Sequence, residues 1–399
     1  MKGWKEAYTP KRKEGGEEVW ERTYHLLTPL FGGGVEPKTK DPVTVVRATE
    51  VRGQLRFFWR AIRGWRAEGS LDKLRDLEAE IFGSTDRSSP LVVFLKTEKE
   101  GESKHVFVDQ PGKSFPKAQP IGVPLTGKHI GVPLTGKHEV AHPYLAFPLQ
   151  KNKQDPKNYP VQVGVVFRLT LRFPKELLEE VEAALWAWET FGGIGARTRR
   201  GFGAIAREGS SPPKEEEIRE RLRRYSRPAG WPEGVPHLTP ESLVRVVPLS
   251  WREVAERYQK FRQDRTGQGG RPGKNRWPEP DALRRLLTRR APQASLDKFP
   301  RGQFGLPIIF HFRDKTLPNS TLKGAEAERL ASPLLFRPLA EKMVLVAVLE
   351  APRVPKGGAV LEWEKQRVKV DVFLTPEEAK RIPKLAGKTD PIRAFVESL

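Results

Sequence analysis

The segment GGIGARTRRGFG at residues 192–203 places three arginines, Arg197, Arg199 and Arg200, among five glycines. Guanidinium groups bind phosphate bidentately, and glycines such as Gly193 and Gly195 let the backbone approach a ligand closely. The loop follows a predicted helix and lacks a Gly-Lys-Ser/Thr ending, so neither a dinucleotide fingerprint nor the phosphate loop of nucleotide hydrolases is indicated. We expect contact with a phosphodiester chain; a tight hairpin with incidental charge is the alternative.

A row of arginines forms the second candidate surface. On a helix over residues 52–66, an arc of about 120° contains Arg52, Arg56, Arg60, Arg63 and Arg66, and apolar residues occupy the adjacent arc. Within and just after this stretch the one acidic residue is Glu68, so local ion pairs do not account for the row. We expect phosphate binding here; a solvated, ion-paired helix face is the alternative.

A third basic stretch combines cations with an indole. Lys274 and Arg276 shortly precede Trp277, whose ring is expected to stack on a base. A linker of the same composition is the alternative.

The composition favours a nucleic-acid partner. The chain carries 71 Lys+Arg against 50 Asp+Glu, a net charge of +21. Its longest apolar runs have the length of strands and the N-terminus has no apolar signal core, so we expect a cytoplasmic protein without membrane contact. The absence of cysteine excludes disulfides and thiolate chemistry, and with two methionines it is typical of a thermophile.

Catalytic residues are sparse. His25 is a candidate acid or base for RNA cleavage, although a structural strand histidine is the simpler interpretation. A metal could use His129, His138 and His142, but two of these come from a duplication; Asp41 and Asp86 lack a second carboxylate. We therefore expect no catalytic set, no metal and no cofactor.

The elements that position these residues predict an α+β protein with two ferredoxin-like (RRM-like) domains. Residues 1–210 would form the first, 211–240 a linker and 241–399 the second. Helices are expected at 52–66, 175–191, 251–262, 280–287 and 376–382, with a short charged helix inside the linker. Strands are expected at 19–27, 91–95, 105–108, 144–149 and 161–173, and a second sheet at 243–249, 303–312, 343–349 and 368–373.

An arm at 111–143 interrupts the first predicted domain. It contains the nine-residue repeat IGVPLTGKH at 121–129 and again at 130–138. A solvated loop that reaches a neighbour or ligand and a duplication tolerated at a loop tip are both compatible with this pattern.

Five segments together resemble one protein family. They are LLTPLFGGGVEP at 26–37, RATEVRGQLRFFWRA at 47–61, GGIGARTRRGFG at 192–203, GKNRWPEPDALR at 273–284 and RLASPLLFRPL at 329–339. The loop 192–203 is similar to the RAMP superfamily in general, and the other segments resemble the large RAMP subunit of the type III-B CRISPR effector, the Cmr complex.

The resemblance implies two ferredoxin-like domains that bind the 3′ portion of guide RNA, target single-stranded RNA or both, beside other Cmr subunits. The target-cleaving aspartate belongs to another subunit of that family, so this chain is expected to be non-catalytic. Two alternatives remain: a RAMP-type guide-processing endoribonuclease that uses His25, and a general single-stranded RNA-binding protein.

Overall fold

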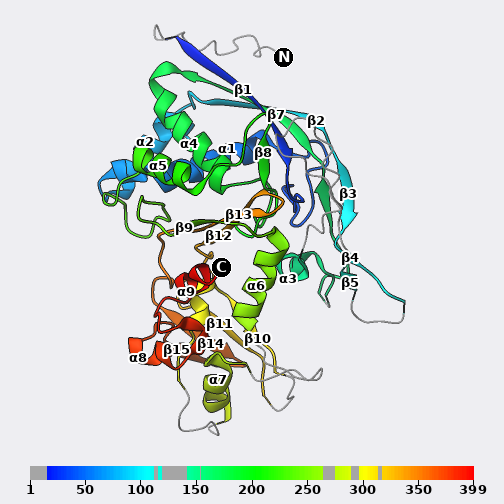
Figure 1. The fold of residues 1–399 in the computed structure, drawn as a ribbon, viewed down its shortest axis with the longest axis vertical. Helices are drawn as coiled ribbons and strands as arrows, with labels where there is room; N and C mark the ends of the chain where they lie inside the picture. The colour runs from blue at the N-terminus through cyan, green and yellow to red at the C-terminus, as the bar shows by residue number, and fades with distance from the viewer. Residues whose placement is uncertain are drawn as a thin grey trace, which may run out of the picture.

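The computed structural model describes residues 16–111, 116–118, 142–152, 154–263, 275–288, 296–312 and 317–399. Helices and strands are interspersed, and the strands pair antiparallel in small sheets, so the α+β class is confirmed. Figure 1 shows a first sheet at the top, a second across the middle and a third below it.

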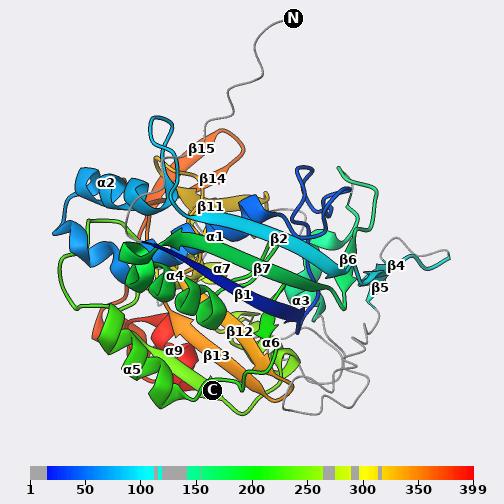
Figure 2. The ribbon, with the colours of Figure 1, turned by 90° about the horizontal axis from the view of Figure 1, so that it is seen from above.

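In the first sheet the order of the strands in space differs from their order in the sequence. In space its strands are β2 (Val92–Lys99), β7 (Val166–Pro174), β1 (Glu17–Leu26) and β8 (Ile205–Arg207). The helix α1 (Ala48–Arg63) lies between β1 and β2 in sequence, and α4 (Leu178–Phe191) lies between β7 and β8. This is the order of a β-α-β-β-α-β unit, and Figure 2 shows β2, β7 and β1 side by side.

Alternation along β7 determines which face of this sheet is covered. Phe167, Leu169, Leu171 and Phe173 are buried, whereas the residues between them are more exposed. The buried face shares a core with α1 and α4, including the fully buried Trp59 and Trp188. Period-two burial of this kind is typical of a sheet with one solvated face.

Several elements extend the first half. A 3₁₀ turn (Gly64–Ala67) follows α1 and leads into α2 (Leu71–Phe82), whose N-terminus is capped by the Ser70 hydroxyl. Between β2 and β7 lie two small strand pairs, β3 (Glu102–His105) with β6 (Pro160–Val163) and β4 (Phe107–Val108) with β5 (Lys117–Ala118).

The strand predicted at 144–149 is wrong. These residues belong to the short helix α3 (Pro143–Ala146) and a 3₁₀ turn (Phe147–Leu149). Pro143 suits a first helical turn, and the His142 side chain accepts a hydrogen bond from the Tyr144 N–H at 3.3 Å. The repeats at 121–129 and 130–138 lie outside the described residues.

Each of the two faces of the middle sheet packs against a hydrophobic core. Its strands are β12 (Leu334–Ala340), β13 (Met343–Val348) and β9 (Val244–Val247), in that order. Leu345 and Ala347 of β13 belong to the core of the first sheet, whereas Val344 and Val346 belong to a core formed with α6. The two halves of the chain therefore share this sheet.

The third sheet contains β10 (Ile308–Phe310), β11 (Ser320–Gly324), β14 (Ala359–Trp363) and β15 (Gln366–Val370). The four strands expected to form one sheet in the second half are thus divided, since β9 and β13 lie in the middle sheet and β10 and β15 in this one. The strands β11, β12 and β14, which the sequence did not predict, complete the two sheets.

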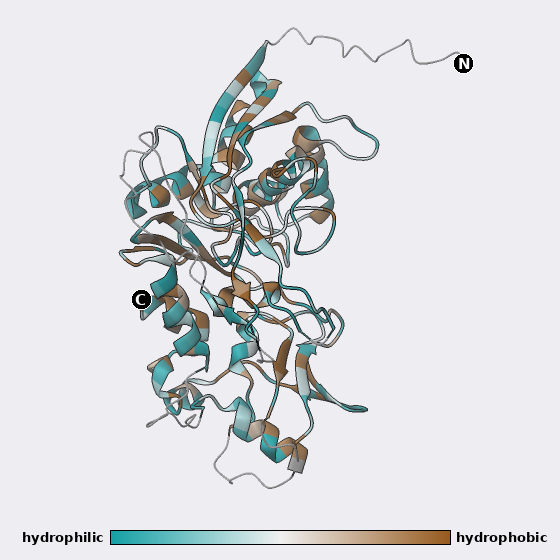
Figure 3. Cartoon of the chain, turned by 90° about the vertical axis from the view of Figure 1, so that its right-hand side faces the viewer, coloured by the Kyte–Doolittle hydropathy of each residue, from teal (hydrophilic) through white to brown (hydrophobic). Residues whose placement is uncertain are grey.

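In the described part of the second half the α-helices are α6 (Trp251–Gln263), α7 (Glu279–Thr288), α8 (Pro376–Lys380) and α9 (Pro391–Glu397). Figure 3 shows hydrophilic and hydrophobic residues interspersed along the helices and strands. No helix in the described ranges is long and apolar enough to cross a membrane.

The connection at 211–240 contains α5 (Glu215–Tyr225). This helix buries Ile218, Leu222 and Tyr225 in the core of the first sheet. The short charged helix is therefore confirmed, and it is packed on the first half. The boundaries at 210 and 240 stay a prediction.

Candidate nucleic-acid interface

The glycine–arginine loop, residues 192–203, connects α4 to β8 and is bonded to the segment that follows β1. The Ala196 N–H donates to the Phe31 carbonyl at 2.7 Å, and the Gly203 N–H donates to the Pro29 carbonyl at 2.8 Å. A further bond of 2.9 Å joins the Ile194 N–H to the Gly203 carbonyl. The loop is thus held in one conformation by backbone hydrogen bonds.

The glycines of this loop are required by its own packing. Gly195 and Gly203 have φ of +80° and +61°. A Cβ on Gly195 would lie 2.7 Å from the Phe31 carbonyl oxygen, and one on Gly203 would collide with the Ile194 carbonyl. Gly193 is buried, contrary to the expectation that its backbone is open to a ligand.

Arg197 is held beside an exposed aromatic ring. It adopts the left-handed conformation, with φ of +61°, and its Nη1 donates to the Leu145 carbonyl at 3.0 Å. Its guanidinium carbon lies 5.0 Å from the centre of the Phe147 ring. Phe147 is 59% exposed, so one aromatic ring and one cation are presented together at the surface.

Arg199 and Arg200 reach the middle sheet. Arg199 Nη1 donates to the Ser332 carbonyl at 2.6 Å, and its guanidinium carbon lies 5.4 Å from the Phe57 ring of α1. Arg200 Nη1 donates to the Leu334 carbonyl at 2.8 Å. Each guanidinium is therefore held by a carbonyl oxygen. Because a carbonyl is neutral, the positive charge of the arginine is not neutralised by this bond.

The charges of this loop lack acidic partners. Among the described residues no carboxylate lies within ion-pair distance of Arg197, Arg199 or Arg200. Burial first, and then the charge of Arg200, lower the pKa of both Arg197 and Arg199 to about 10. A bound anion would relieve this repulsion, and a phosphodiester is an anion of suitable geometry.

Several residues of the interface escaped the sequence analysis. Phe57 was not singled out on its predicted helix, and Phe147 fell in the segment predicted as a strand. Glu50 at the start of α1 accepts a hydrogen bond from the Gly195 N–H, and burial raises the pKa of its carboxyl. The exposure of Phe147 and the Glu50–Gly195 contact depend on tertiary packing, so no local sequence signal indicates them.

The arginine row of α1 has partners from other helices. Arg56 and Arg60 both pair with Glu78 of α2, the latter at 2.6 Å, and Arg52 donates to the Phe82 carbonyl. No acid is available to these arginines locally in the sequence, but the fold brings Glu78 of α2 to Arg56 and Arg60. Their guanidinium groups contact α2 and the residue that ends it, whereas the glycine–arginine loop contacts α1 through Phe57.

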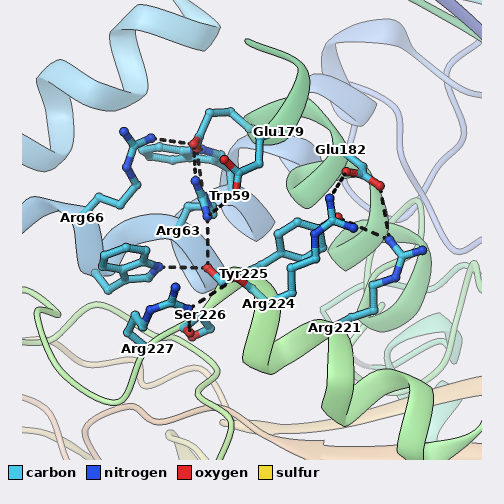
Figure 4. A network of polar contacts seen from close by, with 12 residues as sticks. Trp59, Arg63, Arg66, Glu179, Glu182, Arg221, Arg224, Tyr225, Ser226 and Arg227 are labelled. Atoms are coloured by element: carbon cyan, nitrogen blue, oxygen red, sulfur yellow. Dashed lines mark hydrogen bonds and ion pairs between the residues drawn. The ribbon is translucent and has the colours of Figure 1, made fainter. Parts of the chain in front are cut away.

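Arg63 and Arg66 belong to a polar network that is buried around Arg63 (Figure 4). Arg63 is 5% exposed and donates from Nε to Glu180 at 3.1 Å, while Arg66 Nη1 and Trp59 Nε1 reach the same carboxylate at 2.6 and 2.7 Å. These bonds join α1 to α4. Arg63 thus has an internal structural role and offers almost no surface to a ligand.

The residues of the third basic stretch differ in their surroundings, and the structure describes only some of them. Lys274 lies outside the described residues, and Arg276 is exposed. Trp277 is 1% exposed, and its Nε1 donates to the Phe261 carbonyl at 2.9 Å. A buried indole cannot stack on a base, so the expected role of Trp277 is contradicted.

The catalytic candidates remain dispersed. His25 lies on β1, 3.9 Å from Glu208, and Asp41 accepts hydrogen bonds from the Val43 and Thr44 N–H groups. Asp86 is in an exposed loop, His142 caps α3, and His129 and His138 lie outside the described part. In the residues that the structure describes, no three His, Asp or Glu side chains are grouped to hold a metal.

Comparisons with known proteins found one protein family and one curated relative that are similar to part of this chain. Residues 23–206 match the model of the RAMP superfamily. A curated protein of Pyrococcus furiosus, the CRISPR system Cmr subunit Cmr1-2, is 24% identical over 199 residues, which is 47% of this chain and 95% of that protein. These matches confirm the resemblance to RAMP subunits of Cmr systems.

Solved structures of such subunits are also similar. The apo crystal structure of Cmr1 from Pyrococcus furiosus has a TM-score of 0.49 at 16% identity, covering 86% of this chain and 94% of that one. A subunit of a type III-B Cmr-beta complex, determined by cryo-electron microscopy with cognate target RNA, AMPPnP and ssDNA, has a TM-score of 0.48 at 13% identity, with 96% and 98% covered.

Proposed function

We propose that this chain, whose residues 23–206 match the model of the RAMP superfamily, is a non-catalytic RNA-binding subunit of a type III-B CRISPR ribonucleoprotein. Its ligands are guide RNA, through the 3′ portion, and target RNA, and its partners are other Cmr subunits. The observation that carries the proposal is the set of three loop arginines that have carbonyl partners but no carboxylate among the described residues.

The proposed mechanism is charge neutralisation together with stacking. Arg197, Arg199 and Arg200 bind phosphates, and the exposed Phe147 ring stacks on a base without selecting it. The charges of Arg52, Arg56 and Arg60 on α1 add to the attraction of RNA, although their contacts with α2 limit their reach. Sequence selection is left to base pairing between guide and target.

The proposed arrangement assigns residues 1–210 and 241–399 to two domains. The middle sheet, which packs on both cores, would keep them in one orientation. The glycine–arginine loop contacts that sheet, so RNA bound to the loop would lie along the junction. The compartment we propose is the cytoplasm.

The experiment that tests this function is purification of the tagged protein from its native cells, followed by sequencing of the RNA and identification of the proteins recovered with it. Repeat-derived guide RNA together with other CRISPR subunits is the expected result. A control purification uses a variant with Arg197, Arg199 and Arg200 replaced by Gln, which should recover less RNA. Mixed cellular RNA, or none, from the unaltered protein would contradict the proposal.

A processing endoribonuclease that uses His25 is the alternative from another class. His25 lies on β1, and its Nε2 is 3.9 Å from the carboxylate of Glu208. Cleavage of repeat RNA by the isolated protein, abolished by His25→Ala, would favour this enzyme over the binding subunit.

A further inference from the structure

Tyr258 of α6 lies between arginines from two parts of the chain. The guanidinium carbon of Arg200, in the glycine–arginine loop, is 5.3 Å from the centre of the Tyr258 ring, and that of Arg262 is 5.6 Å from it. Arg200 Nη2 also lies 3.4 Å from the Tyr258 hydroxyl. The loop and α6 therefore present two cations on one aromatic ring.

A second phenol completes this cluster. Arg262 Nη1 donates to the Tyr144 hydroxyl at 3.4 Å, and the Tyr144 and Tyr258 rings are 6.0 Å apart. Tyr144 is in α3, beside the Leu145 carbonyl that fixes Arg197. Two guanidinium groups and two phenolic hydroxyls, all of them hydrogen-bond donors, thus converge from three elements.

The cluster has an excess of positive charge. Within the described ranges neither Arg200 nor Arg262 has a carboxylate partner, and Arg262 Nε is buried without a hydrogen-bond acceptor. The neighbouring Arg301 differs, because its Nε lies 3.2 Å from the buried carboxylate of Glu279. Unneutralised cations held close together in a partly buried cluster are costly unless an anion joins them.

We propose that Arg200, Arg262, Tyr144 and Tyr258 form a binding site for one phosphate group of the RNA backbone. This inference rests on the proposed function, since it takes RNA as the ligand, and it adds α6 of the second half to the interface. Arg200, Arg262 and Tyr144 are partly exposed, so a backbone phosphate can reach them without a cavity. Tyr258 is 1% exposed, so its hydroxyl, 3.4 Å from Arg200 Nη2, would position the guanidinium and not touch the phosphate itself.

The geometry favours a phosphodiester over a base at this position. The cluster carries the full positive charges of two guanidinium groups, and the phosphodiester is the part of RNA that carries a negative charge, whereas the bases are neutral. The phosphate would neutralise charge from both halves of the chain and hold the loop against α6. Binding at this site should therefore be independent of sequence and sensitive to salt.

The test measures the affinity of the full chain for an unstructured single-stranded RNA of 15 nucleotides over a range of salt concentrations. Arg262→Met is compared with Lys260→Met, which removes the same charge from an exposed position two residues away on α6. The site predicts that Arg262→Met weakens binding roughly tenfold and lowers the salt slope by about 0.7, the value for one phosphate contact on a single strand. Lys260→Met should leave both nearly unchanged.

Tyr258→Phe and Tyr144→Phe provide a second measurement, because they keep the packed rings and remove only the hydroxyls. Each should weaken RNA binding about threefold while the melting temperature stays near that of the unaltered protein. If Arg262→Met fails to fold, these two variants decide the question.

Two outcomes would overturn the inference in different ways. If Arg262→Met and both Phe variants behave like Lys260→Met, whereas replacement of Arg197, Arg199 and Arg200 weakens binding, the phosphate site is wrong and the proposed function stands. If the unaltered protein binds the RNA without salt dependence, or does not bind it at all, the phosphate site and the proposed function are both wrong.

Discussion

Arg63 and Glu180 are 117 residues apart in the chain and form a buried ion pair between α1 and α4. Side-chain exposure is 6% for Arg63 and 10% for Glu180. Desolvation alone would raise the pKa of Glu180, but the hydrogen bonds and charge of Arg63 and the contacts of Trp59 and Arg66 lower it overall. The pair connects the two helices that cover the first sheet.

Replacing Arg63 with Met should therefore destabilise the protein by about 3 kcal/mol, because it leaves a buried carboxylate with fewer partners. The measurement is the free energy of unfolding in urea. Arg75→Met is the control, since Arg75 pairs with Asp72 at the surface and should cost less than about 0.5 kcal/mol. Equal costs for the two variants would contradict the structural role of Arg63.

This pair also shows what the sequence could not predict. The helix was expected correctly because helical spacing is a local property, and α1 covers most of the predicted range, although Arg66 lies in the 3₁₀ turn that follows it. Their partners Glu78 and Glu180 come from α2 and α4, and no pattern within 52–66 indicates them. Pairing across elements depends on tertiary packing, so the absence of a local acid did not make the arginines free.

For the other elements too, local sequence patterns predicted some features, and features that depend on tertiary packing were missed. The alternation at 161–173 predicted a strand, which the structure shows as β6 and β7. At 144–149 the apolar pattern suggested a strand, but six residues are too few to distinguish two periods, and Pro143 begins a helix. Trp277 was expected at the surface from its basic neighbours, although burial of an indole depends on the fold around it.

The glycines of the loop give a prediction about stability. Gly203→Ala should cost about 2 kcal/mol or more, because the new Cβ would collide with the Ile194 carbonyl and the residue has positive φ. Gly209→Ala is the matched control, with φ of +71° and open space around the Cβ, and should cost only about 1 kcal/mol. If both cost the same in thermal unfolding, packing does not explain the glycine at 203.

Phe147 gives a prediction about stacking. Since the ring is 59% exposed, Phe147→Ala should leave the melting temperature nearly unchanged. Loss of one stacked base should weaken binding of single-stranded RNA by about 1–3 kcal/mol in a fluorescence anisotropy titration. Phe373→Ala, a change at a ring that is 48% exposed in another part of the chain, controls for general loss of apolar surface. Unaltered affinity of Phe147→Ala would exclude the stacking contact.

Glu50 gives a prediction about pH. Burial raises the pKa of this carboxyl, partly offset by the Gly195 N–H and the charge of Arg47. The folded state therefore keeps the proton of Glu50 to a higher pH than the unfolded chain does. As a result, the free energy of unfolding falls as the pH rises from the unfolded pKa, about 4.3, to the raised folded pKa. Glu50→Gln removes that loss.

The stability of Glu50→Gln relative to the unaltered protein should consequently increase between about pH 4 and pH 7, as measured by urea unfolding at each pH. Glu17→Gln, at an exposed position of β1, controls for the change in net charge. A stability difference for Glu50→Gln that decreases with pH would mean that the ionised carboxylate is favoured at this site.

The central claim is that the glycine–arginine loop binds RNA, and it is tested most directly by the salt dependence of binding in a triple variant. With Arg197, Arg199 and Arg200 replaced by Gln, the slope for an unstructured RNA should fall by about 2, since each phosphate contact on a single strand contributes about 0.7. A control that replaces the exposed Lys365, Arg367 and Lys369 removes the same charge. Equal slopes for the two folded variants would contradict the account.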